Sequence, residues 1–330
     1  MILTKTPYRI ALSGGGTDLE YYYKKKNGRL FTLAIDQYAY VHLSSRSLDN
    51  NYFIQTSDTH FSKNLKNIKH KLIKETLKFY KIKDKVHVGT YSTVPTRTGL
   101  GTSSAILIGL INCILKYKNI KKTNKQIIKD AYKIERKICG YKGGWQDQTI
   151  SQLGGLVRLD IDKGENLKFK KLKISKKLNR FISNHLVLVY TKEKRESSKI
   201  IKSQKKNHNI IDLYDGIKEL NNELLSSLKE LKVEKIANVF NKHWDIKKKL
   251  SKVITNHRLN LLYKKLMLEH KCLGGKLIGA GGGGFFLMVV KNKKKIIKSF
   301  KKSKISFLDL NPDNLGSRII DTNKNNFHKI

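Results

Sequence analysis

The stretch Pro95–Leu107, PTRTGLGTSSAIL, combines residue types that bind an anion. Gly99 and Gly101 allow the backbone to approach a ligand, and a helix expected to begin near Ser103 would point its free N–H groups at that ligand. Hydroxyl groups that could add hydrogen bonds or bind one Mg²⁺ ion follow at Thr102, Ser103 and Ser104. The stretch lacks the Lys-Ser/Thr pair of a Walker loop and the third glycine of a dinucleotide fingerprint. It indicates a phosphate site, and the alternative is an ordinary helix N-cap.

Glu135 lies on the apolar face of an amphipathic helix expected over residues 124–138. Ile128, Ala131 and Ile138 share that face at helical spacing. A buried carboxylate is costly unless it is paired or bound to a metal ion. We therefore expect either a salt bridge to a nearby lysine or a Mg²⁺ site that joins Glu135 to a hydroxyl group of the GLGTSS loop.

Two aspartates follow glycine turns. Asp147 comes just after Gly143 and Gly144 in GYKGGWQDQ, where it could be aimed into a cleft as a general base or could cap a helix. Asp18 follows Gly14–Gly16 in LSGGGTDLEYY. It could accept hydrogen bonds from the hydroxyl groups of a polyol, or it could also cap a helix.

The segment GAGGGGFF, residues 279–286, is too rich in glycine to be explained by stability, because glycine loses more backbone entropy on folding than other residues. Close approach of this backbone to a ligand or to another loop is the better explanation.

Strands and helices interleave along the chain without a regular βαβ spacing, which favours an α+β fold. Strands are expected at 8–13, 87–94, 154–161, 186–190 and near 306–310, and helices at 104–118, 124–138, 210–231, 233–250 and 257–270. The pattern changes between about 175 and 185. We therefore expect two domains, 1–180 and 181–330.

The composition limits the class of protein. The longest apolar run, Ala105–Leu115, already contains Gly109 and Asn112, so no membrane segment is expected. The N-terminus lacks the plan of a signal peptide, and three widely spaced cysteines fit a reducing, cytoplasmic setting. The net charge of +42 favours an anionic partner such as nucleic acid, but the lysines are spread along the chain, which is typical of compositional drift.

Taken in order, these segments resemble the motifs of the GHMP small-molecule kinases. PYRIALSGGGTD is similar to the first motif of that family, PTRTGLGTSSA to the phosphate loop, and KLIGAGGGGFF to the glycine-rich third motif. The resemblance implies a two-domain α+β kinase with a ferredoxin-like C-terminal domain and an active site between the domains. One departure is Thr102, which stands where many members have serine but retains a hydroxyl group.

The resemblance also implies roles for single residues. Ser103 and Glu135 match the Mg²⁺ ligands, Asp147 the catalytic aspartate, and Arg9 a basic residue near the transferred phosphoryl group. The ATP phosphates would be bound by Gly99, Leu100, Gly101, Thr102, Ser103 and Ser104. The substrate would be bound by Gly15, Gly16, Thr17, Asp18, Gly281 and Gly282, with Arg195 as a candidate for binding a phosphate of the substrate or for a surface salt bridge.

Within the family, the segments GGGTD and GGWQDQ are most similar to kinases that phosphorylate the anomeric hydroxyl group of a sugar. We expect ATP and Mg²⁺ as cofactors, a heptose 7-phosphate as the acceptor, a monomer or homodimer, and no nucleic-acid partner. The alternatives are L-fucose, a galactokinase-like substrate or, in a different class, a nucleic-acid-binding protein on a kinase scaffold.

Overall fold

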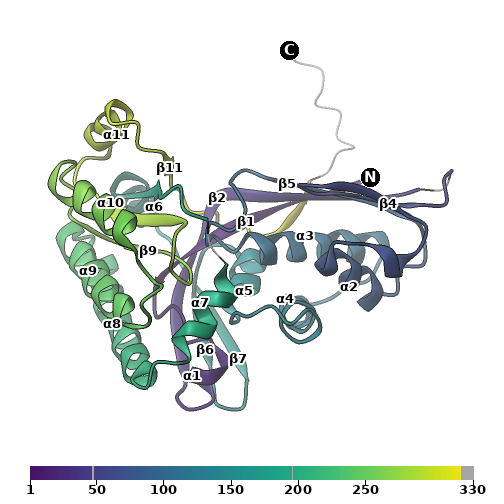
Figure 1. The fold of residues 1–330 in the computed structure, drawn as a ribbon, viewed down its shortest axis with the longest axis horizontal. Coiled ribbons are helices and arrows are strands. Elements are labelled where there is room, and N and C mark those ends of the chain that lie inside the picture. Colours follow the sequence, from purple (N-terminus) through teal and green to yellow (C-terminus); the bar gives the residue numbers. More distant parts are fainter. Residues whose placement is uncertain (47, 195, 321–330) are drawn as a thin grey trace.

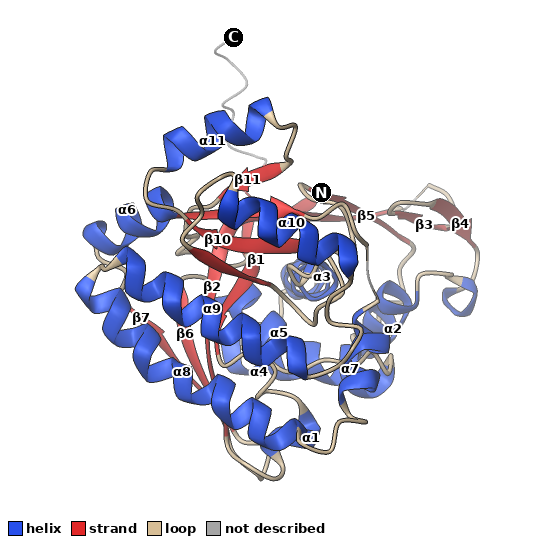
Figure 2. Cartoon of the chain, turned by 60° about the vertical axis from the view of Figure 1, so that its left-hand side comes forward, coloured by secondary structure: helices blue, strands red, loops and turns tan. Residues whose placement is uncertain are grey.

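The computed structural model describes residues 1–46, 48–194 and 196–320, and these residues form two β-sheets with helices packed on them (Figure 1). The larger sheet has eight strands and belongs almost entirely to the first half of the chain. The smaller sheet has four strands and belongs to the second half. Helix and strand types are shown together in Figure 2.

The larger sheet is organised by one long strand, β2 (Gly28–Ser45), which pairs with three neighbours: β1, β5 and β6. The strand order of this sheet is β12-β1-β2-β5-β3-β4. In addition, β6 pairs with β2, and β7 pairs with β6. The other strands are β1 (Ile2–Ser13), β3 (Tyr52–Gln55), β4 (Thr59–Ser62), β5 (Val86–Ser92), β6 (Leu156–Ile161), β7 (Leu167–Leu172) and β12 (Arg318–Ile320).

The helices of the first half gather around α3 (Thr102–Tyr117), which packs on β1 and β2. Between Ala105 and Leu115 the only polar side chain of α3 is that of Asn112, and ten residues of the helix are buried, as expected for a helix that is covered on most sides. Gly109 brings α3 close to the sheet, because a Cβ atom there would lie 2.9 Å from Thr4 Oγ1. Around α3 lie α2 (Lys71–Phe79), α4 (Asn124–Tyr132) and α5 (Gln146–Leu153).

The smaller sheet has the order β11-β8-β10-β9 and is antiparallel throughout. If these four strands are numbered 1 to 4 along the chain, their order in the sheet is 4-1-3-2, and helices lie in the two crossovers. This is the ferredoxin-like arrangement. The strands are β8 (Leu186–Tyr190), β9 (Gly274–Leu277), β10 (Phe285–Val289) and β11 (Phe307–Asp309). The helices of this half are α6 (Lys176–His185), α7 (Ser197–Gln204), α8 (Ile210–Glu230), α9 (Val233–Lys249), α10 (His257–Leu268) and α11 (Lys293–Lys302).

The strand β10 is apolar at every position because both faces of the smaller sheet are covered. Phe285 and Leu287 belong to one hydrophobic cluster, whereas Phe286 and Met288 belong to another. The first of these clusters also contains Tyr8 and other residues of β1. The two halves therefore share a continuous core and hold each other in position.

The expected α+β class is confirmed, and most of the expected elements are observed with ends shifted by a few residues. β1 begins at Ile2, six residues before the expected strand 8–13, and the long strand β2 is absent from the prediction. The expected division near 180 coincides with α6, but the last described residues return to the larger sheet, where β12 pairs with β1. The Asp313 N–H donates to the carbonyl oxygen of Ala34 at 3.0 Å, which fixes this return.

One detail of the predicted helix over 124–138 is wrong. The α-helix α4 ends at Tyr132, and a π-helical segment follows over Lys133–Ile138. Because a π-helical turn adds a residue, the 3.6-residue periodicity is broken and Ile138 is 40% exposed. Ile128, Ala131 and Glu135 are buried as predicted.

No helix among residues 1–46, 48–194 and 196–320 is long and apolar enough to cross a bilayer.

The contact between Gly284 and Thr98 joins the glycine-rich loop before β10 to the loop before α3. Gly284 has φ +97°, and a Cβ atom there would lie 2.0 Å from the carbonyl oxygen of Thr98. We expect Gly284→Ala to push the two loops apart, lowering Tm by several degrees and raising the KM for ATP. Gly140→Ala is the matched control, because Gly140 also has positive φ (+73°) but has no atom within 4 Å of a Cβ. Equal effects of the two substitutions would show that backbone strain, and not the loop contact, is responsible.

Candidate active site

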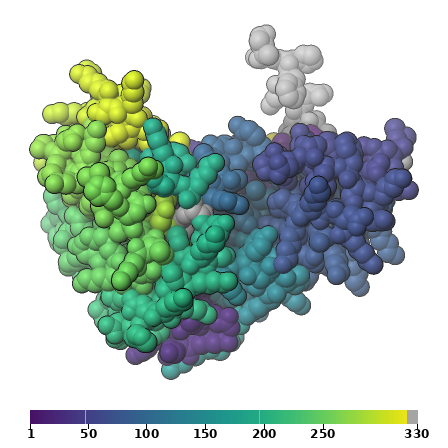
Figure 3. All heavy atoms as spheres, viewed as in Figure 1, coloured from purple at the N-terminus to yellow at the C-terminus, as the bar shows by residue number. Residues whose placement is uncertain are grey.

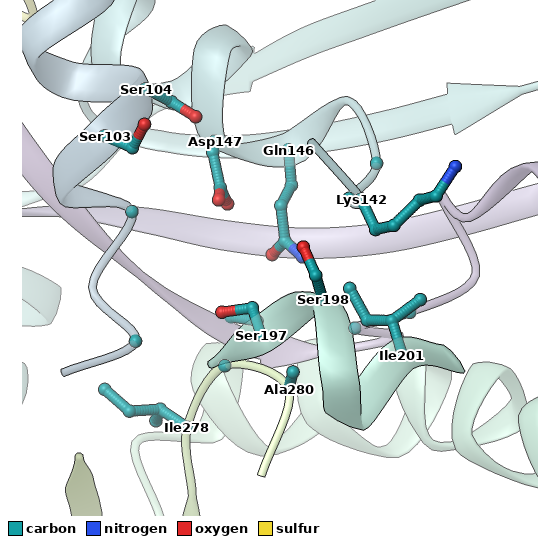
Figure 4. A pocket seen from close by; sticks show the side chains of 18 of the residues that line it. Ser103, Ser104, Lys142, Gln146, Asp147, Ser197, Ser198, Ile201, Ile278 and Ala280 are labelled. Atoms are coloured by element: carbon teal, nitrogen blue, oxygen red, sulfur yellow. The ribbon is translucent and has the colours of Figure 1, made fainter. Parts of the chain in front are cut away.

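A cavity of about 550 Å³ lies between the two halves, within the range of small-molecule sites. Its wall includes β1, the loop before α3 and the start of α5 from the first half, and α7, α9 and the end of β9 from the second half. In the space-filling view, residues near position 200, drawn in teal, lie between the green second half and the blue first half (Figure 3). Figure 4 shows Ser103 and Asp147 on one side of the pocket, and Ser197 and Ala280 on the other.

The loop before α3 has the geometry of an anion site. Gly99 and Gly101 have φ +85° and +79°, a conformation that glycine adopts without strain. Gly101 occupies the N-cap position of α3, and no side chain there accepts a hydrogen bond from the first turn. The N–H groups at the start of this 16-residue helix therefore face the cavity without a side-chain cap. This arrangement disfavours the alternative of an ordinary Ser or Thr cap.

Arg9 fixes this loop to β1. Its backbone N–H donates to the carbonyl oxygen of Leu100 at 3.1 Å, and its Nη1 donates to the carbonyl oxygen of Gly99 at 2.7 Å. Leu100 itself is fully buried in the core and anchors the loop from below. The other five residues of the predicted phosphate loop line the cavity: Gly99, Gly101, Thr102, Ser103 and Ser104.

Asp147 and Arg9 form an ion pair beside the phosphate loop. Arg9 Nε and Nη2 lie 2.6 and 2.5 Å from Oδ1 of Asp147, and a Cβ atom on Gly101 would be 3.4 Å from the Asp147 carboxyl carbon. Asp147 lies in the first turn of α5, whose N-cap is Trp145, so Asp147 is not the cap residue. Its carboxylate points into the pocket (Figure 4).

Asp18 caps α5 from a distant part of the sequence. Its Oδ2 accepts the N–H of Gln146 at 3.0 Å, whereas its Oδ1 is buried without a partner. Gly144 makes this approach possible, since a Cβ atom there would lie 2.1 Å from Oδ2. Burial, and to a lesser extent the charge of Asp147, raise the pKa of the Asp18 carboxyl above its ordinary value. Asp18 lines the cavity, and its Oδ1 atom is therefore a hydrogen-bond acceptor without a partner at the cavity wall.

Glu135 is only 2% exposed and is held by hydrogen bonds. Its Oε2 accepts from Ser104 Oγ at 2.6 Å and from Gln148 Nε2 at 2.5 Å, and its Oε1 lies 3.4 Å from Arg136. The hydroxyl group paired with Glu135 is therefore that of Ser104, whereas Ser103 is exposed at the cavity wall. The salt-bridge partner is an arginine and not one of the nearby lysines.

The two glycine-rich segments differ in their relation to the cavity. Gly15 and Gly16 line it, but Thr17 donates its hydroxyl group to the backbone oxygens of Gly14 and Arg29 and faces the interior. In the third motif the cavity wall is formed by Gly279 and Ala280.

Gly281 and Gly282 pack against other parts of the chain instead of lining the cavity. A Cβ atom on Gly281 would meet Ile254 at 2.7 Å, and one on Gly282 would meet Ile200 at 2.5 Å. Of the two explanations for the glycine-rich segment, contact with another part of the chain therefore applies at these positions, with the loop that contains Ile254 and with α7. Arg195 lies outside the described residues.

Sequence reasoning missed several residues of the cavity wall. These are Lys142, Gln146, Ser197, Ser198, Gln204, Tyr214, His243, Lys247 and Lys276. Lys276 carried a detectable signal, because a lysine between Gly275 and Leu277 interrupts an otherwise apolar strand. Lys142 lies in the loop before α5, and the others come from helices whose contact with the cavity depends on tertiary packing.

One cavity between the two halves contains three features: an anion-binding loop at a helix N-terminus, the Arg9–Asp147 ion pair, and a buried carboxylate with a hydroxyl partner. Together they are typical of a phosphotransferase site. Comparison with known proteins agrees. Residues 66–155 match the model of the GHMP kinases N terminal domain and residues 224–302 that of the GHMP kinases C terminal domain, together just over half of the 330 residues.

Three similar proteins are informative. A D-glycero-alpha-D-manno-heptose 7-phosphate kinase of Campylobacter jejuni is 29% identical over 297 residues, which are 85% of this chain and 86% of that protein. The structure of a putative sugar kinase from Campylobacter jejuni has a TM-score of 0.77 at 26% identity and covers 97% of this chain and 98% of its own. A D-glycero-D-manno-heptose 1-phosphate kinase from Bacteroides thetaiotaomicron has a TM-score of 0.81 at 20% identity, with 97% and 99% covered, and so shows the fold.

The chain belongs to the GHMP kinases. It is a phosphotransferase that uses ATP and has a hydroxyl group as acceptor.

Proposed function

We propose that this kinase transfers the γ-phosphoryl group of ATP to the anomeric hydroxyl group of D-glycero-D-manno-heptose 7-phosphate, giving the 1,7-bisphosphate. The observation that carries the chemistry is the ion pair between Arg9 of β1 and Asp147 at the start of α5, which lies in one cavity with the phosphate loop. The identity of the acceptor is supported by the similarity to the Campylobacter jejuni heptose 7-phosphate kinase over 85% of the chain.

The reacting groups follow from this geometry. Asp147 accepts the proton of the attacking hydroxyl group while the bond between the γ-phosphorus and the bridging oxygen of ATP breaks, and ADP leaves. Arg9 holds the Asp147 carboxylate in place and adds positive charge where negative charge develops on the transferred group. The proton passes from Asp147 to solvent after the product has formed.

The acceptor sugar is oriented by unpartnered oxygen atoms. Asp18 Oδ1 and Gln146 Oε1 are both buried without a hydrogen-bond partner, and both residues line the cavity. Sugar hydroxyl groups would satisfy these acceptors, which removes the cost of leaving them unpaired. Gly15 and Gly16 allow the sugar to lie close to the backbone.

The residues around Glu135 fit a divalent cation. A buried carboxylate, the hydroxyl group of Ser104 and the unpartnered oxygen of Gln148 provide the oxygen donors that Mg²⁺ prefers. Glu135 and Ser104 would hold the ion, with Ser103 directed at the phosphates. Mg²⁺ would supply charge neutralisation on the nucleotide phosphates when bound.

A substrate panel tests the identity of the acceptor. We expect the highest kcat/KM with D-glycero-D-manno-heptose 7-phosphate when ADP release is measured against the unphosphorylated heptose, L-fucose, D-galactose and mevalonate. Phosphorus NMR of the product should show a phosphate on the anomeric carbon. Higher kcat/KM with any other compound of the panel would contradict the proposed acceptor without affecting the kinase assignment.

Asp147→Asn tests the general base. We expect kcat to fall by about 10²- to 10⁴-fold, since the amide cannot accept the proton. The affinity for a non-hydrolysable ATP analogue should stay near that of the wild type. Because Arg9 also loses an ionic partner, Tm is measured in parallel, and near-normal kcat in a folded variant would exclude Asp147 as the base.

Mg²⁺ titrations of activity distinguish the two serines. We expect Glu135→Gln and Ser104→Ala to increase the Mg²⁺ concentration needed for half-maximal activity by about 10-fold or more, because each removes an oxygen donor. Ser103→Ala is the matched control one residue away, and it should change the KM for ATP more than the Mg²⁺ requirement. The reverse order of the two serines would assign the ion to Ser103.

A further inference from the structure

Three basic side chains of the second half are buried at the wall of the same cavity. His243, Lys247 and Lys276 are 4%, 6% and 2% exposed, and all three line the cavity. None of them has a role in the mechanism derived above. Burying positive charge is costly, so such a cluster requires an explanation.

The fold brings these residues together from two elements. On α9, His243 and Lys247 are four residues apart and follow Phe240 on the same buried face. Lys276 projects from β9, with its ammonium group 4.9 Å from the centre of the Phe240 ring. α9 packs directly on β9, which makes the cluster compact.

A β-bulge in β1 provides one hydrogen-bond acceptor for Lys276. The pairing of β1 with β2 shifts between Ala11 and Ser13, and the carbonyl oxygen of Leu12 at this point accepts a hydrogen bond from Lys276 Nζ at 2.6 Å. An ammonium group has three N–H donors, so this contact satisfies only part of its capacity.

The positive charge of this cluster is not balanced by neighbouring carboxylates. Among residues 1–46, 48–194 and 196–320, no carboxylate forms a salt bridge with Lys276 or His243. Both ring nitrogens of His243 are buried without a hydrogen-bond partner. Burial and the charges of Lys276 and Lys247 hold the pKa of His243 well below its ordinary value, and burial lowers the pKa of Lys276 to about 7.

We propose that His243 and Lys276, supported by the charge of Lys247, form a subsite for the phosphate group that the acceptor already carries and that is not transferred. A dianion placed here would accept hydrogen bonds from the N–H group of the His243 ring and from the remaining donors of Lys276, and would offset the repulsion within the cluster. This inference rests on the proposed function, because it requires a phosphorylated acceptor.

The position of the subsite separates it from the ATP phosphates. Arg9, which contacts Asp147 and the phosphate loop, and Leu12, which contacts Lys276, are three residues apart on β1. That separation is about 10 Å along an extended strand. A seven-carbon sugar with phosphate at the far end from the anomeric carbon has the length to join the two sites.

The alternative is that Lys276 only ties β9 to β1 through the Leu12 carbonyl oxygen. A purely structural lysine would affect stability and every substrate equally. A phosphate ligand would affect only acceptors that carry a phosphate group.

Kinetics of Lys276→Met and His243→Leu separate these possibilities. For each variant we expect the KM for heptose 7-phosphate to rise by about 10- to 100-fold, the effect of losing a hydrogen bond to a charged group. The KM for ATP and the kcat/KM for the unphosphorylated heptose should stay within about twofold. Lys248→Met is the control on α9, because Lys248 is paired with Asp245 at the surface.

A parallel loss of kcat/KM with both forms of the sugar would overturn the proposal. If the wild type phosphorylates only unphosphorylated sugars, the proposed function fails first. The subsite is then tested with inorganic phosphate on enzyme whose phosphate loop is filled by a non-hydrolysable ATP analogue and Mg²⁺. Stabilisation of the wild type but not of Lys276→Met would still support the subsite, and equal responses would reject it.

The pH dependence of the KM gives a second readout that a structural lysine would not produce. The groups packed around Lys276 are Phe240, His243 and Lys247 from α9 and the Leu12 carbonyl from β1. With its pKa near 7 in the free enzyme, Lys276 loses its proton as the pH rises above 7, whereas a bound phosphate keeps it protonated. The KM for heptose 7-phosphate should therefore rise from pH 7 to pH 9 in the wild type and stay flat in Lys276→Met.

Discussion

The position of Arg9 in the middle of β1 is the constraint on which the rest of the site depends. Its side chain binds Asp147 at the start of α5 and the Gly99 carbonyl oxygen in the phosphate loop, and its backbone binds Leu100. These partners are 90 to 138 residues away in the sequence. Arg9 is only 4% exposed, so its charge needs a buried partner, which is Asp147. The pair fixes the start of α5 beside the loop that precedes α3.

Glycines allow the surrounding backbone to come close enough to support this pair. Gly144 leaves space for the Asp18 carboxylate, and Gly284 leaves space for the Thr98 carbonyl oxygen. The first contact places the Asp18 carboxylate beside the start of α5, and the second brings the third motif against the loop before α3. The geometry of the cavity therefore depends on close backbone contacts that any side chain at these two positions would prevent.

The two halves contribute different groups to the cavity. The first half contributes the phosphate loop, Asp147, Arg9 and Glu135, whereas the second half closes the cavity and contributes buried positive charge through Lys276 and its neighbours. The shared hydrophobic cluster, in which β1 packs with residues of α8 and α9, holds the two contributions at a fixed spacing.

The sequence by itself determined the α+β class, most long helices, and the loop that precedes α3, because these follow from local periodicity and glycine placement. It also indicated Glu135 as a buried carboxylate, but it could not show that Ser104 is the hydroxyl group bonded to it. That choice depends on the rotation of α3 against a π-helical segment that α-helical periodicity does not predict.

Tertiary structure alone decided which distant groups meet. Asp18 caps α5 across 128 residues, and Lys276 reaches β1 across 264 residues. Gly281 and Gly282 pack against Ile254 and Ile200 instead of lining the cavity. Such contacts are set by how two sheets pack around a common core, and a linear pattern contains only the spacing of residues along one element. The chemistry of the phosphate loop was therefore readable in the sequence, whereas the shape and charge of the acceptor site were decided by the packing of the two halves.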